Sequence, residues 1–490
     1  MKKLTLAAAS VALALGLTAC NKQDTTQTQT AAAQNEAPAA VVKAPLVSGV
    51  DTQYFDPAVK FSEDFFMAIN GKWLAETEIP ADKASYGSFH VLADNSQKAV
   101  KAIIDEVSAR TDLKPGSDEQ KLGSFYNSFM DEATIEKLGL SPLSPQLDAI
   151  KAVTDKTQLP ALFARLQRDG VAIPFGWFVN NDAKNSTEYA VYLGQGGLGL
   201  PDRDYYFKDD EASQKILTAY QQYLTDMFSL AGYADAEAAA QRVFALEKAL
   251  AEHHWTRLES RNADKTYNKM SAADLNTSMG AFDWAGFAAG VKLDGVSDII
   301  VRQPSYFEGF AKVLDATDVQ SWQDYLSLKT IHGYADKLSS NFADRRFAFY
   351  GTTLRGIQEQ QPRWKKAVNA SDEVLGEVAG KLYVAEHFKP EAKARMEVLV
   401  KNVIQAYHDS IDTLEWMTPE TKKAAHEKLN KFTPKIGYPD KWKDYSNLSI
   451  KADDLVGNYK AAAQFAYQEM LNKLGKPIDR TEWFMTPQTV

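Results

Sequence analysis

Apolar residues recur with the period of an α-helix along most of this chain, and this periodicity constrains its fold more than any other feature. One segment spaces them at i, i+3, i+4 and i+7, the pattern of a single buried helix face: Val100, Ile103, Ile104 and Val107. A second segment repeats the pattern over about three turns: Met396, Leu399, Val400, Val403, Ile404 and Tyr407. The chain is therefore predicted to be mainly α-helical, with both of these faces buried.

Signals for the ends of helices fall where such helices need them. Thr418 precedes Pro419, which predicts an N-cap followed by a proline in the first turn. A long segment that starts at Asp453 closes with Gly475, and Pro477 follows two residues later. These signals predict one helix after Thr418 and another that ends before Gly475.

One region departs from the helical pattern. Residues 171–179 and 187–194 are rich in aromatic and β-branched residues, and a polar segment separates them. This arrangement predicts a β-hairpin. The glycine-rich segment that follows, 194–207, contains neither a GxxxxGK[ST] pattern nor the strand–glycine–helix order of a dinucleotide site, so we interpret it as a structural turn.

The amino-terminal end has the features of an export signal. Two lysines precede an apolar stretch that ends in Leu-Thr-Ala-Cys, which resembles a bacterial lipobox. Residues 1–19 are therefore predicted to be a signal peptide and Cys20 to be lipidated, with 20–48 as a flexible tether poor in large apolar groups. Asn21 after the cysteine favours the outer membrane, so we expect a lipid-anchored protein of the bacterial cell envelope that faces the periplasm.

Charge and cysteine content exclude some classes of partner and cross-link. The formal net charge is −9, which argues against binding to nucleic acid and against a basic membrane-binding surface. Cys20 is the only cysteine, so a disulfide within one chain cannot form. The stability of the fold must therefore come from burial of apolar surface.

No motif within the chain satisfies a known catalytic pattern. A zinc site of the HExxH type needs two histidines four residues apart, and Asn430 occupies the second position after His426-Glu427. The inverted pattern HxxEH fails before His387 and before His253. The sequence also contains no GxSxG segment. Local chemistry thus predicts no catalytic and no metal-binding residue among the seven histidines: His90, His253, His254, His332, His387, His408 and His426.

Longer patterns are more informative than these short motifs. Segment 62–92 contains Asp-Phe-Phe, Asn-Gly-x-Trp and Ile-Pro elements in the order found in the neprilysin-like zinc metallopeptidases. The chain resembles that family in seven segments: 62–92, 198–207, 261–270, 362–368, 375–388, 414–429 and 435–446. The resemblance implies a large helical lid lobe, roughly 80–350, and incomplete catalytic-lobe elements, roughly 49–79 and 351–490, that together form an amino-terminal peptidase domain over 49–490.

The resemblance also implies where catalysis takes place. In this family zinc is held by an HExxH helix and an ExxxD helix that follow an Asn-Ala-x-Tyr element, and the sequence stops at Val490, where that element is expected. We therefore expect that this chain binds no zinc and is inactive alone. Three readings stay open: part of an endopeptidase for short oligopeptides, a lipid-anchored peptide-binding or partner-docking domain without catalysis, or a half completed by a separate catalytic polypeptide.

Some individual residues acquire expected roles from the resemblance. Ser85, Tyr86 and Gly87 are expected to line the substrate chamber. Ser85 and Ala93 stand where some animal members have arginines that hold the terminal carboxylate of a substrate, so a preference for free carboxyl termini is not expected here. Three aromatic residues are expected to be core anchors: Phe65, Trp73 and Trp364.

Overall fold

The structure, a computed structural model, describes residues 49–489, which fall into two compact units divided between Thr77 and Glu78. The smaller unit contains the helix α1 (Phe65–Glu76), which Asp64 caps by accepting a hydrogen bond from the backbone N–H of Met67. Helix α1 buries only Ala68 and Gly71, and Phe65 is 64% exposed. The prediction that Phe65 is a core anchor is therefore wrong, because its side chain lies off the one buried side of this helix.

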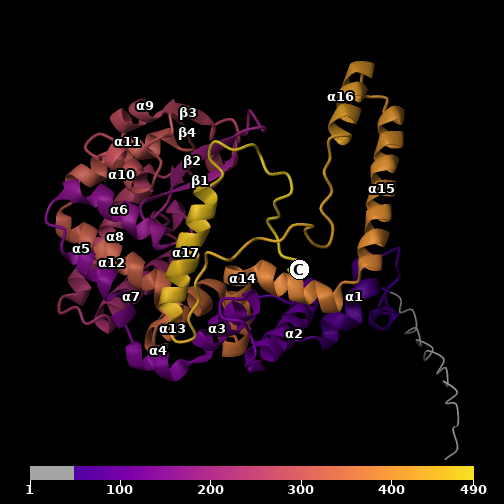
Figure 1. Cartoon of the computed structure of the whole chain (residues 1–490), viewed down its shortest axis with the longest axis horizontal. Coiled ribbons are helices and arrows are strands. Elements are labelled where there is room, and N and C mark those ends of the chain that lie inside the picture. Colours follow the sequence, from indigo (N-terminus) through magenta and orange to yellow (C-terminus); the bar gives the residue numbers. More distant parts are fainter. Residues whose placement is uncertain (1–48, 490) are drawn as a thin grey trace, which may run out of the picture. The chain divides into compact units, whose positions relative to one another are not determined.

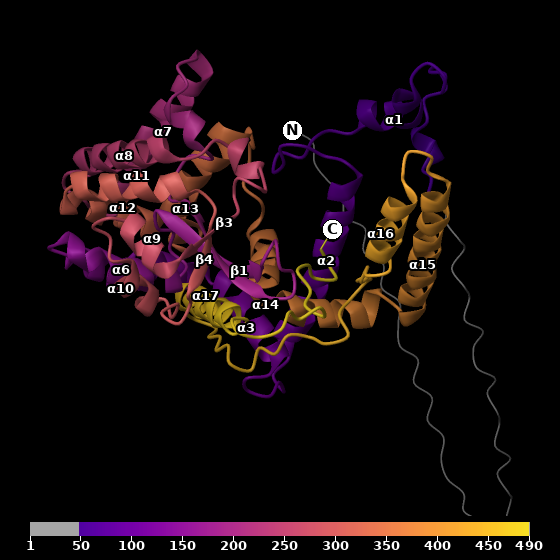
Figure 2. The same cartoon turned by 90° about the horizontal axis from the view of Figure 1, so that it is seen from above.

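The larger unit is mainly helical, as the sequence predicts. Its described residues form sixteen α-helices (Figures 1 and 2): α2 (Ser88–Ala109), α3 (Asp118–Met130), α4 (Glu132–Leu138), α5 (Ser144–Lys151), α6 (Leu159–Arg168), α7 (Glu211–Leu230), α8 (Ala236–His253), α9 (Ala272–Ser278), α10 (Trp284–Gly290), α11 (Pro304–Ala316), α12 (Val319–Tyr334), α13 (Ser340–Phe347), α14 (Arg363–His387), α15 (Pro390–Thr413), α16 (Pro419–Leu429) and α17 (Leu455–Leu471). None of the helices in residues 49–489 combines the length and the apolar character needed to cross a bilayer.

A small mixed sheet accompanies the helices. The predicted hairpin is confirmed as β1 (Phe175–Asn181) and β2 (Tyr189–Gln195), and β1 begins just after a proline, which cannot donate to the ladder. Two further strands, β3 (Asn268–Ser271) and β4 (Asp298–Val301), extend the sheet in the order β1-β2-β4-β3. The pairing of β2 with β4 is parallel. These four-residue strands are too short to show alternation in the sequence, so the sheet is larger than predicted.

Two hydrophobic clusters form the core of the larger unit. The first spans helices α5–α13 and the sheet, and Phe175 on β1 lies among the rings of other aromatic residues: Phe163, Phe282, Phe287, Phe307 and Phe310. The second joins α2, α3, α14 and the segment before α17, and it buries the predicted face of α2 that includes Val100 and Ile104. Trp364 packs against this second cluster. Residues of 80–350 contribute to both clusters, and the division into the two predicted lobes stays a prediction.

Helix α15 confirms the second predicted helix but not its burial. Neither α15 nor α16 contains a buried residue, and Leu399 and Tyr407 are 51% and 61% exposed. Figures 1 and 2 show these two helices side by side, apart from helices α5–α13. The prediction of a buried face on this segment is therefore wrong. Within the described residues, α16 is the main helix that packs against α15, and it leaves the predicted face exposed or half-buried.

Two buried histidines predict that acid destabilises the fold. Burial lowers the pKa of His332 to about 3 and that of His254 to about 4. The unfolded chain, with histidine pKa values near 6.5, takes up these protons first, so stability is complete above about pH 6.5 and falls as the pH is lowered. We expect a loss of about 2 kcal/mol per histidine at pH 5. Urea denaturation at pH 7.5 and pH 5 measures it, and a His332→Gln variant should lose less between the two pH values than the unmodified chain.

Candidate functional site

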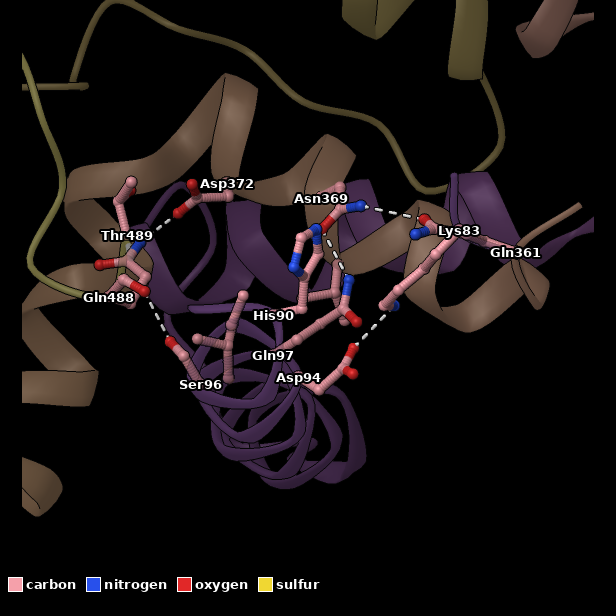
Figure 3. A pocket seen from close by; sticks show the side chains of 13 residues that line it. Lys83, His90, Asp94, Ser96, Gln97, Gln361, Asn369, Asp372, Gln488 and Thr489 are labelled. Atoms are coloured by element: carbon pink, nitrogen blue, oxygen red, sulfur yellow. Dashed lines mark hydrogen bonds and ion pairs between the residues drawn. The ribbon is translucent and has the colours of Figure 1, made fainter. Parts of the chain in front are cut away.

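A cavity of about 320 Å³ lies between the amino-terminal half of α2 and the first half of α14 (Figure 3). The segment before α2 and the last described residues of the chain complete its wall. We call this cavity the α2–α14 pocket; its lining residues are Lys83, His90, Ala93, Asp94, Ser96, Gln97, Val100, Gln361, Val368, Asn369, Asp372, Gln488 and Thr489. Most of these side chains are polar. Helix α2 packs its apolar face into the second cluster, and its polar side faces the pocket.

The charged groups at one end of the pocket neutralise each other. Lys83 Nζ lies 3.1 Å from Asp94 Oδ1, and Lys365 Nζ lies 3.6 Å from the same oxygen and 3.3 Å from Asp82 Oδ2. Partial burial tends to raise the pKa of the Asp94 carboxyl, but the hydrogen bonds and positive charges of Lys83 and Lys365 hold that pKa below its usual value. A ligand at this end of the pocket would therefore meet lysines already paired with aspartates, and no unpaired cation.

Amide side chains form the middle of the pocket. Gln97 Nε2 donates to Asn369 Oδ1 at 2.7 Å and to the carbonyl of Lys365 at 3.3 Å, and Asn369 Nδ2 donates to Gln361 Oε1 at 3.3 Å. Figure 3 shows this chain of amides crossing from α2 to the segment before α14. Each amide has a donor and an acceptor side, so the chain can match the alternating N–H and C=O groups of a peptide backbone.

The last described residues close the other end of the pocket. Ser96 Oγ donates to the carbonyl of Gln488 at 2.6 Å, and Gln488 Nε2 donates to the Asp372 carboxylate and, at 2.9 Å, to the carbonyl of Gly376. Burial raises the pKa of Asp372, against the opposing effect of the hydrogen bonds from Gln488 and Thr486. The segment around Gln488 is thus held to α2 and α14 by side-chain contacts.

The three residues expected to line the substrate chamber lie beside this pocket. Gly87 is the N-cap of α2, Ser85 is exposed, and Tyr86 is half-buried with its ring centroid 5.8 Å from that of His90. The Tyr86 hydroxyl lies 3.5 Å from Asp94 Oδ2. None of the three lines the α2–α14 pocket itself, and their role in a chamber stays a prediction.

The chain matches the model of one protein family over most of its length. The model for the amino-terminal part of peptidase family M13 matches residues 61–439, most of the described chain. The chain belongs to peptidase family M13. The resemblance to neprilysin-like zinc metallopeptidases inferred from the sequence motifs is thereby confirmed.

Other M13 proteins agree with this assignment. Human endothelin-converting enzyme 1 is 28% identical over 510 residues, which cover 98% of this chain and 64% of that protein. The zinc metalloprotease ZMP1 of Mycobacterium tuberculosis, in complex with an inhibitor, is 40% identical, with a TM-score of 0.85 over 90% of this chain and 67% of that one. PEPO from Lactobacillus rhamnosis, 23% identical with a TM-score of 0.79, shares the fold. The chain spans somewhat less than two thirds of the length of the curated relatives it matches.

The described residues do not fit the zinc ion of this family. His426 Nδ1 and His408 Nδ1 lie 2.7 Å apart and their rings meet edge to edge at these nitrogens, while His426 Nε2 contacts Asp412 Oδ1 at 2.8 Å. These contacts already engage both nitrogens of the only His-Glu pair that resembles an HExxH motif. Within residues 49–489 no group of three or more His, Cys, Asp or Glu side chains is arranged to hold a metal ion.

Proposed function

We propose that this chain is the peptide-binding, non-catalytic part of an M13 zinc metallopeptidase that acts on short peptides in the bacterial cell envelope. The observation that carries the proposal is the amide-lined α2–α14 pocket, which lies within the segment matched by the family. Lipidation at Cys20, which lies outside the described residues, would hold the protein at the outer membrane, facing the periplasm. No catalytic step is assigned to the chain's own residues.

The chemistry of the pocket favours the backbone of a peptide over its terminal carboxylate. Lys83 and Lys365 are both engaged by Asp82 and Asp94, so neither offers an unpaired positive charge. Ala93 lines the pocket at a position where an arginine would supply one. The pocket is therefore expected to accept internal peptide segments as well as free carboxyl termini.

Exposed apolar residues support the presence of a further catalytic part. Leu399, Val403 and Tyr407 form an exposed stripe on α15, and Phe484 and Met485 are exposed near the last described residues. Apolar patches of this kind are typical of surfaces that contact another polypeptide segment. We propose that the zinc-binding part of the peptidase covers this surface, whether it belongs to the same polypeptide or to a separate one. A stand-alone peptide-binding domain is the second candidate, and it requires the same pocket but no such cover.

Binding and cleavage of labelled peptides test this proposal. We expect fluorescence anisotropy to show binding of five- to ten-residue peptides. An Asn369→Ala variant should bind them about tenfold more weakly, because it lacks the amide whose hydrogen bonds to the bound peptide are expected to contribute about 1–1.5 kcal/mol to the binding free energy. The control is Gln405→Ala, which deletes an exposed amide on α15 and should leave binding unchanged.

Each part of the proposal has its own contradicting outcome. Equal affinity of the Asn369→Ala variant and the unmodified chain for the peptide would show that the pocket takes no part in peptide recognition. Stoichiometric zinc together with chelator-sensitive cleavage of a quenched peptide would show that the chain is catalytic by itself.

A further inference from the structure

A second cavity, of about 590 Å³, lies between α15 and two later segments, 433–441 and 480–483. We call it the α15 groove. None of its lining residues belongs to the α2–α14 pocket, and the side of α15 that it uses, marked by Val400 and Ile404, differs from the exposed stripe of Leu399, Val403 and Tyr407. The groove is therefore a separate feature of the molecule.

The floor of the α15 groove is apolar and only partly covered. Val400 and Ile404 supply it from α15, Ile436 supplies it from the facing segment, and the rings of Tyr438 and Trp483 lie beside them. All five side chains are half-buried, so each keeps apolar surface open to the cavity. A volume of this size falls within the range of about 300–1,000 Å³ that is typical of ligand sites.

The rim of the groove is basic, in contrast to the chain as a whole. Five of its fifteen lining residues are Lys or Arg and two are acidic, whereas the whole chain has 55 basic and 64 acidic residues. Lys393 is engaged by Asp440 at 3.1 Å and by the carbonyl of Tyr438 at 3.0 Å, and Lys435 donates to the carbonyl of Glu482. Local charge in the groove is thus opposite in sign to the net charge of the protein.

Two of the rim cations are not used by the fold. The side chains of Lys401 and Arg480 make no ion pair and no hydrogen bond with any other residue of 49–489. Hydrogen bonds from Thr481 lower the pKa of the nearby Asp479 carboxyl, and the positive charge of Lys441 adds to this effect. Glu397 is the one acidic residue on the same wall that has no such partner within this range. The groove therefore retains an excess of positive charge directly beside its apolar floor.

We propose that the α15 groove binds an extended, acidic segment of another polypeptide that carries an apolar side chain. The apolar side chain would pack on Val400, Ile404 and Ile436, and flanking carboxylates would pair with Lys401 and Arg480. Such pairs add specificity because an acidic segment is favoured over a neutral or basic one of the same length. This site goes beyond the proposed peptidase function and does not depend on it.

Fluorescence anisotropy with the full chain tests this proposal directly. The probe is a labelled ten-residue peptide that alternates glutamate and leucine, and the comparison peptide has glutamine in place of every glutamate. We expect the acidic peptide to bind more tightly, with an affinity that falls as salt is added. A Lys401→Glu/Arg480→Glu variant should bind it about tenfold more weakly. The matched control reverses two exposed lysines on other elements, Lys137→Glu/Lys208→Glu, and should bind as the unmodified chain does.

Other outcomes would overturn the proposal. Equal affinity for the glutamate and glutamine peptides would exclude charge recognition, and unchanged binding by the Lys401→Glu/Arg480→Glu variant would place the site elsewhere. Binding to phosphatidylglycerol vesicles that excludes the peptide would identify a membrane surface instead. An Asn369→Ala variant should keep its affinity for the acidic peptide, so failure of the α2–α14 pocket and failure of the groove are distinguishable. Circular dichroism of each variant verifies that it is folded.

Discussion

Replacing Lys329 with Met is expected to lower the free energy of unfolding by about 3–5 kcal/mol. Lys329 on α12 and Glu247 on α8 are both buried, and Lys329 Nζ lies 2.6 Å from Glu247 Oε1. The other oxygen of Glu247 accepts hydrogen bonds from the hydroxyls of Tyr206 at 2.8 Å and Tyr220 at 2.6 Å. Without the lysine, the buried Glu247 carboxyl loses the one ion-pair partner it has among the described residues, and the cost of leaving this polar group buried and unpaired is the reason for the large loss.

The exposed ion pair of the same unit provides a matched control. Lys215 pairs with Glu211 at 2.7 Å, but the two side chains are 75% and 85% exposed. A Lys215→Met variant should therefore lose less than about 0.5 kcal/mol. Urea denaturation of both variants at pH 7 measures the difference. If Lys329→Met lowers the free energy of unfolding no more than Lys215→Met does, the buried ion pair does not stabilise the fold. A Glu247→Gln/Lys329→Met variant should recover part of the loss seen for Lys329→Met, because it also removes the buried carboxylate.

The second large effect is expected from Gly197→Ala in the glycine-rich turn after β2. Gly197 has a φ of +85°, and a Cβ atom there would lie 2.6 Å from Pro174 Cα and 3.0 Å from the carbonyl oxygen of Ile173. It would also overlap the hydroxyl of Tyr325, which donates to the Gly197 carbonyl. The strained φ and the overlap with fixed backbone atoms together predict a loss of about 2–5 kcal/mol.

Two other glycines separate these contributions. Gly232 has a φ of +80° but no atom within 4 Å of a built Cβ, so Gly232→Ala should cost only the conformational part, about 1–2 kcal/mol. Gly176 has an ordinary φ and open space, so Gly176→Ala should be close to neutral. Thermal unfolding of the three variants gives the order. A loss for Gly197→Ala no larger than that for Gly232→Ala would show that the neighbouring backbone can move.

Helices α2 and α15 show how far the sequence predicts the fold. Both carry apolar residues at helical spacing, and both form the expected helices. The face of α2 is buried because α3 and α14 pack onto it, whereas within the described residues the main helical partner of α15 is the shorter helix α16. Periodicity reports which side of a helix can be buried. Whether a partner surface exists is set by segments far along the chain.

The sequence does not predict the α2–α14 pocket, because the residues that line it are far apart along the chain. Gln97 and Asn369 are 272 residues apart, and nothing in the neighbourhood of either residue marks it as functional. The family resemblance predicts Ser85, Tyr86 and Gly87 as chamber-lining residues, and these three lie beside the α2–α14 pocket but do not line it. A chain of amides is recognisable only when the helices that carry its members have been brought together.

The sequence alone determined the elements: the helical class, the cap at Thr418, the hairpin around 175–195 and the membership in a peptidase family are written in local patterns and ordered motifs. Local patterns suffice for these features because backbone hydrogen bonds and caps involve residues only a few positions apart. Tertiary structure decided which faces are buried, that β3 and β4 join the hairpin, that His426 meets His408, and where polar side chains gather into a pocket or a groove. Those outcomes depend on contacts between residues tens to hundreds of positions apart, and no local pattern records them.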